Sequence, residues 1–169
     1  MRAVESELGE FYVRQVALPE LGVEGQKRLR KSRAVIVGLG GLGSVSALYL
    51  TLAGVSFLRL IDQDTVETHN LHRQALYSTD DLRYPKVEVA AKRLKKVNPD
   101  VEIEPVADNL RQSNIHELIH DTNCVVDGLD NVFWQSCPPS LFIPTWPTVT
   151  PLEKACQALG RVCFGCLLL

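Results

Sequence analysis

The sequence predicts an α/β fold in which helices flank a doubly wound, mostly parallel sheet. Three observations support this class. A β-branched hydrophobic run at 34–37 leads directly into a glycine-rich turn, strand patterns alternate with helix patterns as far as residue 131, and the connections are long enough for helical crossovers. Such crossovers are right-handed, and ligands in these folds bind beyond the carboxyl ends of the strands. The polar clusters that follow the strands are therefore the candidate functional residues.

The composition is typical of one soluble globular domain. The chain has 169 residues, of which 46% are hydrophobic and 22% are charged, with a net charge of -2. This charge gives no general attraction to nucleic acid, so nucleic-acid binding is not expected. No hydrophobic run reaches membrane-spanning length, and residues 1–11 lack the apolar core of a signal peptide. We therefore predict a cytoplasmic protein without a membrane partner.

The first 33 residues are expected to form a helical segment that precedes the main domain. The run at 23–31 is polar and has a basic end, which suits the negative C-terminus of a helix dipole. We interpret its charges as a solvent-exposed helix face.

Gly38, Gly40 and Gly43 fill the spacing G-x-G-x-x-G between the first strand and the next helix. In Rossmann-like folds the first glycine permits a tight turn, the second lets a phosphate approach the backbone, and the third allows close helix-to-strand packing. The free N–H groups of the helix would then point at the phosphate. Taken alone, this turn is compatible with NAD, FAD or ATP, and also with an ordinary strand-to-helix turn.

The second strand strengthens the nucleotide interpretation. The helix predicted over 42–53 ends at Gly54, and a strand follows over 57–61. Asp62 comes directly after this strand, about twenty residues beyond the glycine turn, where dinucleotide-binding folds place the acid that binds a ribose hydroxyl.

The remaining elements continue the alternation. Pro85 is predicted at the first position of a helix that ends at Asn98-Pro99. Further strands are predicted over 101–106 and 124–126, with a short helix over 115–119. The domain defined in this way, a Rossmann-like sheet with its helices, covers residues 34–131.

A polar cluster follows the second strand, and its residue types suit a nucleoside triphosphate. The cluster contains Asp62, Asp64, Asn70, Arg73, Gln74 and Lys86. A carboxylate can hold a ribose, while arginine and lysine neutralise phosphate charge. Asp130, at the end of a later strand, is a candidate magnesium ligand, since magnesium binds through one or two carboxylates plus phosphates. NAD needs fewer cations because its pyrophosphate rests mainly on backbone amides, so ATP with Mg²⁺ is favoured.

Some of these polar residues have simpler structural alternatives. Asp64 is equally suited to capping the turn that follows it. Asp127 is suited to fixing the loop after its strand. His69 and His72 lie in the same segment as the cluster, but such histidines are more often packing residues than bases, and we assign them no role.

Short motifs occur in a fixed order along residues 10–131. They are Arg14-Gln15-Val16, the GLGGLG turn, Asp62-Gln63-Asp64-Thr65-Val66, Asn70-Leu71-His72-Arg73-Gln74, Pro85-Lys86-Val87 and Asp127-Gly128-Leu129-Asp130-Asn131. This series resembles the ThiF/MoeB/HesA family, the bacterial and archaeal relatives of the ubiquitin-activating enzymes.

The resemblance implies an adenylyltransferase that uses ATP to adenylate the C-terminal Gly-Gly carboxylate of a ubiquitin-like carrier protein, either a sulfur carrier or a modifier. Pyrophosphate is released, and the mixed anhydride then accepts sulfur or a thiol. The resemblance also implies the site roles: Gly40 and Gly41 line the nucleotide, Asp62 holds the ribose, Asn70, Arg73 and Lys86 surround the phosphates, and Asp130 binds magnesium.

Arg14 is implied to act outside its own chain. In similar proteins the matching arginine reaches the phosphates bound by the partner subunit, so the resemblance implies a homodimer with shared sites. From the residues alone, Arg14 is also suited to a weak surface pair with Glu10 or Glu20.

The composition changes after Asn131. Residues 132–169 form an atypical tail rich in proline and cysteine, in which only 152–159 has a helical pattern. Cys163 and Cys166 form one C-x-x-C pair, half of the paired zinc site of many relatives, so no structural zinc is expected. Without a signal peptide, the thiols are expected to be free or buried rather than joined as disulfides.

This break predicts that the chain is a truncated, alternatively ended or frame-shifted form of a longer enzyme. Translating the genomic region past codon 131 in all frames tests that expectation. Two functions stay open: the adenylyltransferase, and a non-catalytic nucleotide-binding or dimerisation module that keeps the fold but lacks the substrate half. NAD-dependent oxidoreduction ranks last because it leaves Arg73, Lys86 and Asp130 unexplained.

Overall fold

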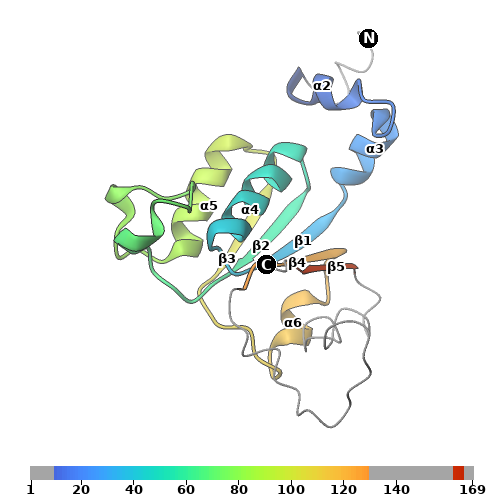
Figure 1. Cartoon of the computed structure of the whole chain (residues 1–169). Coiled ribbons are helices and arrows are strands. Elements are labelled where there is room, and N and C mark those ends of the chain that lie inside the picture. The colour runs from blue at the N-terminus through green and yellow to red at the C-terminus, as the bar shows by residue number, and fades with distance from the viewer. Residues whose placement is uncertain (1–9, 130–161, 166–169) are drawn as a thin grey trace, which may run out of the picture.

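A computed structural model describes residues 10–129 and 162–165 of the chain. In it, five parallel strands form one sheet in the order β3-β2-β1-β4-β5 (Figure 1). The strands are β1 (Arg33–Val37), β2 (Phe57–Ile61), β3 (Glu102–Val106), β4 (Cys124–Asp127) and β5 (Val162–Gly165). The chain moves outward from β1 through β2 to β3 and then returns to the other side of β1 with β4. The prediction of a doubly wound α/β sheet is confirmed.

Helices cover both faces of this sheet. The longer ones are α3 (Gly22–Leu29), α4 (Gly41–Ala53) and α5 (Lys86–Val97), and α6 (Ile115–Ile119) is a single short turn of helix. Figure 1 shows α4 and α5 on one face and α6 on the other. Shorter elements are η1 (Glu10–Tyr12), α2 (Val13–Val16), η2 (Thr68–Asn70) and η3 (Thr79–Asp81). None of the helices in these described ranges is long and hydrophobic enough to span a membrane.

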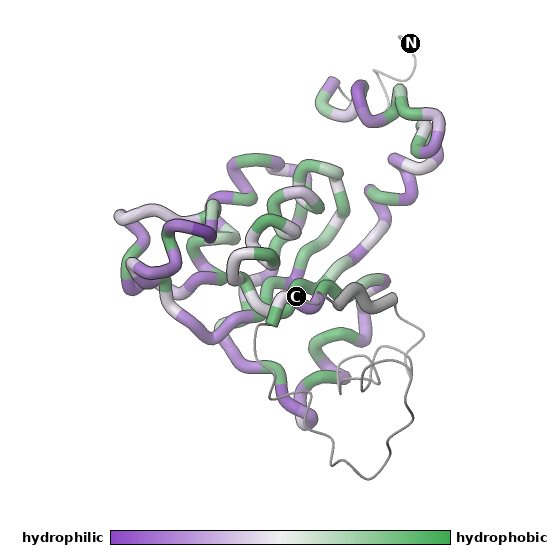
Figure 2. Tube along the Cα trace, in the orientation of Figure 1, coloured by the Kyte–Doolittle hydropathy of each residue, from purple (hydrophilic) through white to green (hydrophobic). Residues whose placement is uncertain are grey.

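The alternating side chains of the strands divide the core into two hydrophobic clusters. The larger cluster contains Ala34, Ile36, Leu58 and Leu60 together with residues of α4 and α5. The smaller contains Val35, Val37, Ile61 and Val125 together with Ile115 and Ile119 of α6. Strands buried on both faces are nearly continuous hydrophobic runs, and the central strands are accordingly mostly green in Figure 2.

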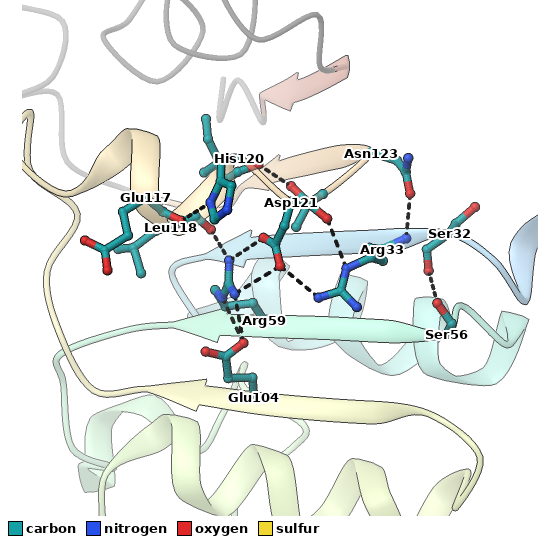
Figure 3. A network of polar contacts seen from close by, with 12 residues as sticks. Ser32, Arg33, Ser56, Arg59, Glu104, Glu117, Leu118, His120, Asp121 and Asn123 are labelled. Carbon is teal, nitrogen blue, oxygen red and sulfur yellow. Dashed lines mark hydrogen bonds and ion pairs between the residues drawn. The ribbon is translucent and has the colours of Figure 1, made fainter.

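An ion network joins three strands to the end of α6 (Figure 3). The Arg59 guanidinium on β2 contacts Glu104 on β3 at 3.0 Å and Asp121 at 2.8 Å. Arg33 on β1 donates to the same Asp121 carboxylate at 2.8 Å and lies over the Phe57 ring at 3.7 Å. Burial opposes ionisation of Asp121, but the hydrogen bonds from Arg59 and Arg33 outweigh it and lower the pKa of this carboxyl group.

The element boundaries differ from the sequence predictions in a few places. Pro85 is the N-cap of α5, with ψ of 131°, and the helix begins one residue later than predicted. Strand β5 has no counterpart among the predictions, and the predicted helix over 152–159 lies outside the described residues. The strand over 57–61 and the helix over 115–119 have their predicted bounds.

Candidate nucleotide site

A pocket of about 700 Å³ lies at the carboxyl ends of the strands. Its walls come from the loops after β1, β2, β3 and β4 and from the segment between β2 and α5. The structure brings nine predicted site residues together there: Gly38, Gly40, Gly41, Asp62, Asp64, Asn70, Arg73, Gln74 and Lys86. This is the crevice where strand order reverses in doubly wound sheets, and its volume suits a small-molecule ligand.

The glycine turn has the geometry that the spacing of its glycines predicts. Gly38 has φ of +83°, and a Cβ there would lie 2.9 Å from the Gly128 carbonyl oxygen. A Cβ on Gly43 would lie 1.8 Å from the Gly38 carbonyl oxygen, so only glycine permits α4 to pack this closely. Gly40 is the N-cap of α4, and a Cβ on it would come no nearer than 3.8 Å to a described neighbouring side chain, that of Gln74. The first turn of α4 therefore faces open space in which an anion can approach its free N–H groups.

Asp62 is held beside this turn by two backbone groups. The Leu39 amide donates to Asp62 Oδ2 at 2.7 Å, and the Asp64 amide donates to Oδ1 at 2.8 Å. Burial raises the pKa of the Asp62 carboxyl group, and the two amide bonds and the Lys86 charge oppose that rise. The carboxylate is thus fixed in orientation and keeps lone pairs for hydroxyl donors.

Lys86 is a buried cation in the pocket wall. Its side chain is 6% exposed, and its ammonium group lies 2.9 Å from the carboxylate of Asp64, whose side chain is 59% exposed. Residues 64–65 and 85–86 run antiparallel and form a short backbone bridge, here called the strap, which brings the two residues together. Thr65 pairs with Pro85, and the Lys86 amide donates to the Asp64 carbonyl oxygen at 3.0 Å. The side-chain contact of Asp64 is with Lys86 and not with the following turn, so the described structure does not support capping, the alternative considered beside a ligand role.

Asn70, Arg73 and Gln74 come from η2 and the turn after it. Asn70 is buried, and its Oδ1 accepts from the Glu67 amide at 3.1 Å as part of a capping box. Arg73 is exposed, and it donates to the His69 carbonyl oxygen at 2.8 Å. Gln74 is 2% exposed, and its Oε1 has no hydrogen-bond partner among the described residues. An orphaned buried acceptor in a pocket wall is suited to a ligand or water that supplies a donor.

The loop after β3 is a part of the pocket that the sequence predictions missed. Asp108, Asn109 and Leu110 line the pocket, and Leu110 is 2% exposed. His69, to which no role was assigned, also lines it and contacts Glu67 at 3.1 Å. The only available signal was position, because polar residues directly follow a strand whose carboxyl end points to the same edge as the others.

Arg14 lies far from the pocket of its own chain. Its neighbour Gln15 donates to the Ala53 carbonyl oxygen at 3.4 Å, at the end of α4 opposite the glycine turn. Because α4 has 13 residues and rises 1.5 Å for each, its two ends lie about 20 Å apart. Arg14 is therefore separated from the glycine turn by about this distance. Within the described ranges Arg14 is exposed and forms no ion pair, so the alternative pairs with Glu10 and Glu20 do not form there.

Two candidate groups fall beyond the described ranges. Asp130 is one residue past Leu129, which lines the pocket, and Cys166 and the side chain of Cys163 are likewise not described. Asp127 accepts from the Leu129 amide at 3.1 Å, which confirms that it fixes this loop. Among the described residues no group of three or more histidine, cysteine or acidic side chains is arranged to hold a metal ion.

Comparison with known proteins gives consistent relatives. The chain is 45% identical over 120 residues to the SAMP-activating enzyme E1 of Haloferax volcanii, covering 71% of this chain and 44% of that protein. It is 44% identical over 131 residues to the sulfur carrier protein adenylyltransferase of Thermus thermophilus, covering 78% of this chain and 48% of that protein. The chain therefore spans about half the length of the curated relatives it matches.

A solved structure supports the same fold. The Escherichia coli tRNA N6-threonylcarbamoyladenosine dehydratase TcdA, in complex with ATP, has a TM-score of 0.73 at 22% identity, covering 98% of this chain and 60% of that one. At this identity the likeness concerns the fold alone. The family comparison matches residues 12–137, about three quarters of the sequence, to the ThiF family. With relatives of the adenylyltransferase type at more than 40% identity, this match shows that the chain belongs to the ThiF family.

Proposed function

We propose that the chain adenylates the C-terminal Gly-Gly carboxylate of a ubiquitin-like carrier protein with ATP. The main observation in support is a pocket that brings together a glycine turn, an oriented carboxylate and two cations, Arg73 and Lys86. The named functions of the relatives, a sulfur carrier protein adenylyltransferase and a SAMP-activating enzyme, favour this reaction over other uses of ATP.

Different pocket residues are proposed to bind different parts of the nucleotide. Asp62 accepts the ribose hydroxyls, the first turn of α4 and Gly40 accommodate the phosphates, and Arg73 and Lys86 neutralise their charge. A carrier carboxylate oxygen attacks the α-phosphorus, forming the acyl–phosphate bond, and the bond from that phosphorus to the β-phosphate oxygen breaks. Pyrophosphate leaves with its electron pair, and no proton transfer is required. Positioning and charge neutralisation therefore supply most of the catalysis.

Magnesium fits this donor set, because it binds through one or two carboxylates plus substrate phosphates rather than through a protein cage. Asp130, which follows the pocket residue Leu129 in the sequence, is the proposed protein ligand. When bound, the ion would neutralise phosphate charge and assist departure of pyrophosphate.

We further propose a homodimer in which each Arg14 serves the pocket of the other copy. Arg14 is exposed and lies about one α4 length, roughly 20 Å, from its own pocket, so it cannot reach its own nucleotide without unfolding. A second copy supplies the missing cation, and a two-fold dimer completes both sites at once. We also place the active unit in the cytoplasm, which cell fractionation would test.

The experiment is isotope exchange between ATP and pyrophosphate, with and without a carrier that ends in Gly-Gly. Exchange that requires the carrier supports adenylation, and Asp130→Ala should then abolish it. The matched control is Asp100→Ala, an exposed aspartate at the opposite end of the sheet, which should leave exchange unchanged.

A non-catalytic nucleotide-binding or dimerisation module is the second candidate. Its support is that the glycine turn and Asp62 are sufficient to bind a nucleotide whether or not a carrier protein is adenylated. ATP binding without carrier-dependent exchange would select this function over adenylation.

A further inference from the structure

We propose that Tyr12 is a positioning residue that fixes the N-terminal arm, residues 10–18, so that Arg14 is presented to the pocket of a second copy. This inference rests on the proposed function in one respect: Arg14 is taken to contact the phosphates bound by another copy of the chain. Its physical basis is a set of contacts between the arm and the end of α4 that lies away from the pocket.

The first contact is the Tyr12 side chain itself. The residue is 2% exposed, and its hydroxyl group accepts a hydrogen bond from Asn98 Nδ2 at 2.7 Å. The same Asn98 group donates to the Thr51 carbonyl oxygen at 2.9 Å. The ring lies against Gly54, where a Cβ would come within 2.5 Å of the Tyr12 ring. Tyr12 is thus clamped between the ends of α4 and α5.

The second contact lies on the other side of Arg14. Gln15 donates to Gln26 Oε1 at 3.2 Å and to the Ala53 carbonyl oxygen at 3.4 Å. Gln26, which is fully buried, donates to the same carbonyl oxygen at 2.8 Å. Because α2 has only four residues, it has no helical stability of its own, and these tertiary contacts fix its direction.

The anchored arm exposes two hydrophobic side chains as well as Arg14. Phe11 is 53% exposed and Leu18 is 54% exposed, three residues before Arg14 and four residues after it. Exposed hydrophobic side chains around an exposed arginine are typical of a protein contact surface rather than of a solvated terminus. The occupant is a second copy of this chain, because its pocket holds the phosphates that Arg14 cannot reach in its own chain.

Mixed dimers test the direction of action. Arg14→Ala is expected to lower exchange about 10- to 100-fold, the value of a charge-assisted contact, and Lys86→Ala is expected to lower it by at least about 100-fold. Mixed one to one, they should regain about a quarter of the wild-type rate, since half of randomly paired dimers are hybrids with one complete site. Tyr12→Ala should be rescued by the Lys86→Ala chain and not by the Arg14→Ala chain. Rescue by the Arg14→Ala chain instead would overturn the proposal.

A double-mutant cycle tests whether Tyr12 acts through Arg14. The double variant Tyr12→Ala/Arg14→Ala should lose no more exchange than Arg14→Ala alone, because the anchor has nothing left to position. Losses that multiply would mean a general structural role and would overturn the proposal. Tyr84→Ala, which removes a tyrosine that is 61% exposed, is the control for loss of an aromatic ring and should add its effect independently.

Two further experiments keep the test decisive. If Tyr12→Ala does not fold, Tyr12→Phe and Gln15→Ala each remove one contact of the arm and should show the same rescue pattern with a loss of a few fold. If the wild-type chain gives no exchange, the adenylation proposal fails by itself, and the cycle is repeated on the dissociation constant of α,β-methylene ATP. Weakening by Tyr12→Ala that adds nothing to the weakening by Arg14→Ala in the double variant supports the anchor. No weakening by Tyr12→Ala, or losses that multiply, would overturn it.

Discussion

Among single residues, Lys86 is the cation that lies buried in the site. It is 6% exposed, and its carboxylate partner in the described ranges is Asp64, which is itself 59% exposed. Removing the exposed member leaves a buried cation with only the more distant Asp62 charge, whereas removing the buried member leaves a carboxylate that water can solvate. The two members of the pair therefore have opposite expected effects on stability.

We expect Lys86→Met to lower exchange by at least about 100-fold while the free energy of unfolding stays equal or rises by up to about 1 kcal/mol. Asp64→Asn should instead lower that free energy by about 1 to 2 kcal/mol. Urea unfolding and isotope exchange on the same preparations measure both quantities. Lys92→Met, on the exposed surface of α5, is the control and should change neither. A clear loss of stability in Lys86→Met would mean that the ammonium group holds the strap together, contrary to this expectation.

Residue spacing was enough to predict most of the pocket, and its limits have physical causes. Asp62 was identified because it directly follows a strand at the distance from the glycine turn that ribose binding requires. Asp108 and Asn109 were missed because the loop after β3 carries no spacing of its own. The position of Arg14 was not predictable, since it depends on a contact between Tyr12 and Asn98, which are 86 residues apart in the sequence.

Among the elements, α4 contacts the pocket at one end and the N-terminal arm at the other. Its first turn faces the pocket, and its last turn ends at Gly54, which has φ of +82° and lies against the Tyr12 ring. A side chain at Gly54 would meet both a strained backbone and an occupied space. Strand β5 had no predicted counterpart, because a four-residue strand next to a proline-rich stretch gives too short a pattern to recognise.

We expect Gly54→Ala to lower the free energy of unfolding by about 3 kcal/mol or more, since the left-handed backbone costs about 1 to 2 kcal/mol and the overlap with Tyr12 adds to it. Gly22→Ala is a close control: its φ is +59°, but no described atom lies within 4 Å of the added Cβ. It should cost only the strain of the left-handed backbone, about 1 to 2 kcal/mol. Thermal unfolding of both variants measures the difference, and equal losses would show that Tyr12 yields its place easily.

The ion network in Figure 3 ties α6 to the sheet and makes part of the stability depend on pH. Because the pKa of Asp121 is lowered in the folded chain, its contribution is fully present above the unfolded-state pKa of about 3.9 and is lost as pH falls through the folded value. We expect Asp121→Asn to cost about 1 to 2 kcal/mol at pH 7 and less at pH 3. Urea titrations at both pH values measure this, with Asp80→Asn, an exposed aspartate away from the network, as the control. A loss that is the same at both pH values would contradict the assigned role.

At the scale of the whole molecule, the strand order brings the polar loops of four strands together at one end of the sheet. The carboxyl ends of β1, β2, β3 and β4 meet at the pocket. The hydrogen bonds of Tyr12 with Asn98 and of Arg33 with Asp121 lie at the opposite end of the sheet. A glycine turn at this end of the sheet suits any nucleotide, so we expect the cations beside it to distinguish a triphosphate from a dinucleotide. On this proposal, ligand selectivity depends on the loops that meet at the pocket and not on the glycine motif alone.

Ligand-dependent stability tests that distinction directly. We expect ATP with Mg²⁺ at one hundred times its dissociation constant to raise the free energy of unfolding by about 2.7 kcal/mol. NAD at the same concentration should give a much smaller increase, because its two phosphates leave Arg73 and Lys86 without the terminal phosphates that they neutralise in ATP. Thermal unfolding with each ligand gives the comparison, and Lys86→Met should remove most of the ATP effect while leaving the small NAD effect unchanged. If NAD stabilised the chain as strongly as ATP, the cations would not select the ligand, and the oxidoreductase alternative would return.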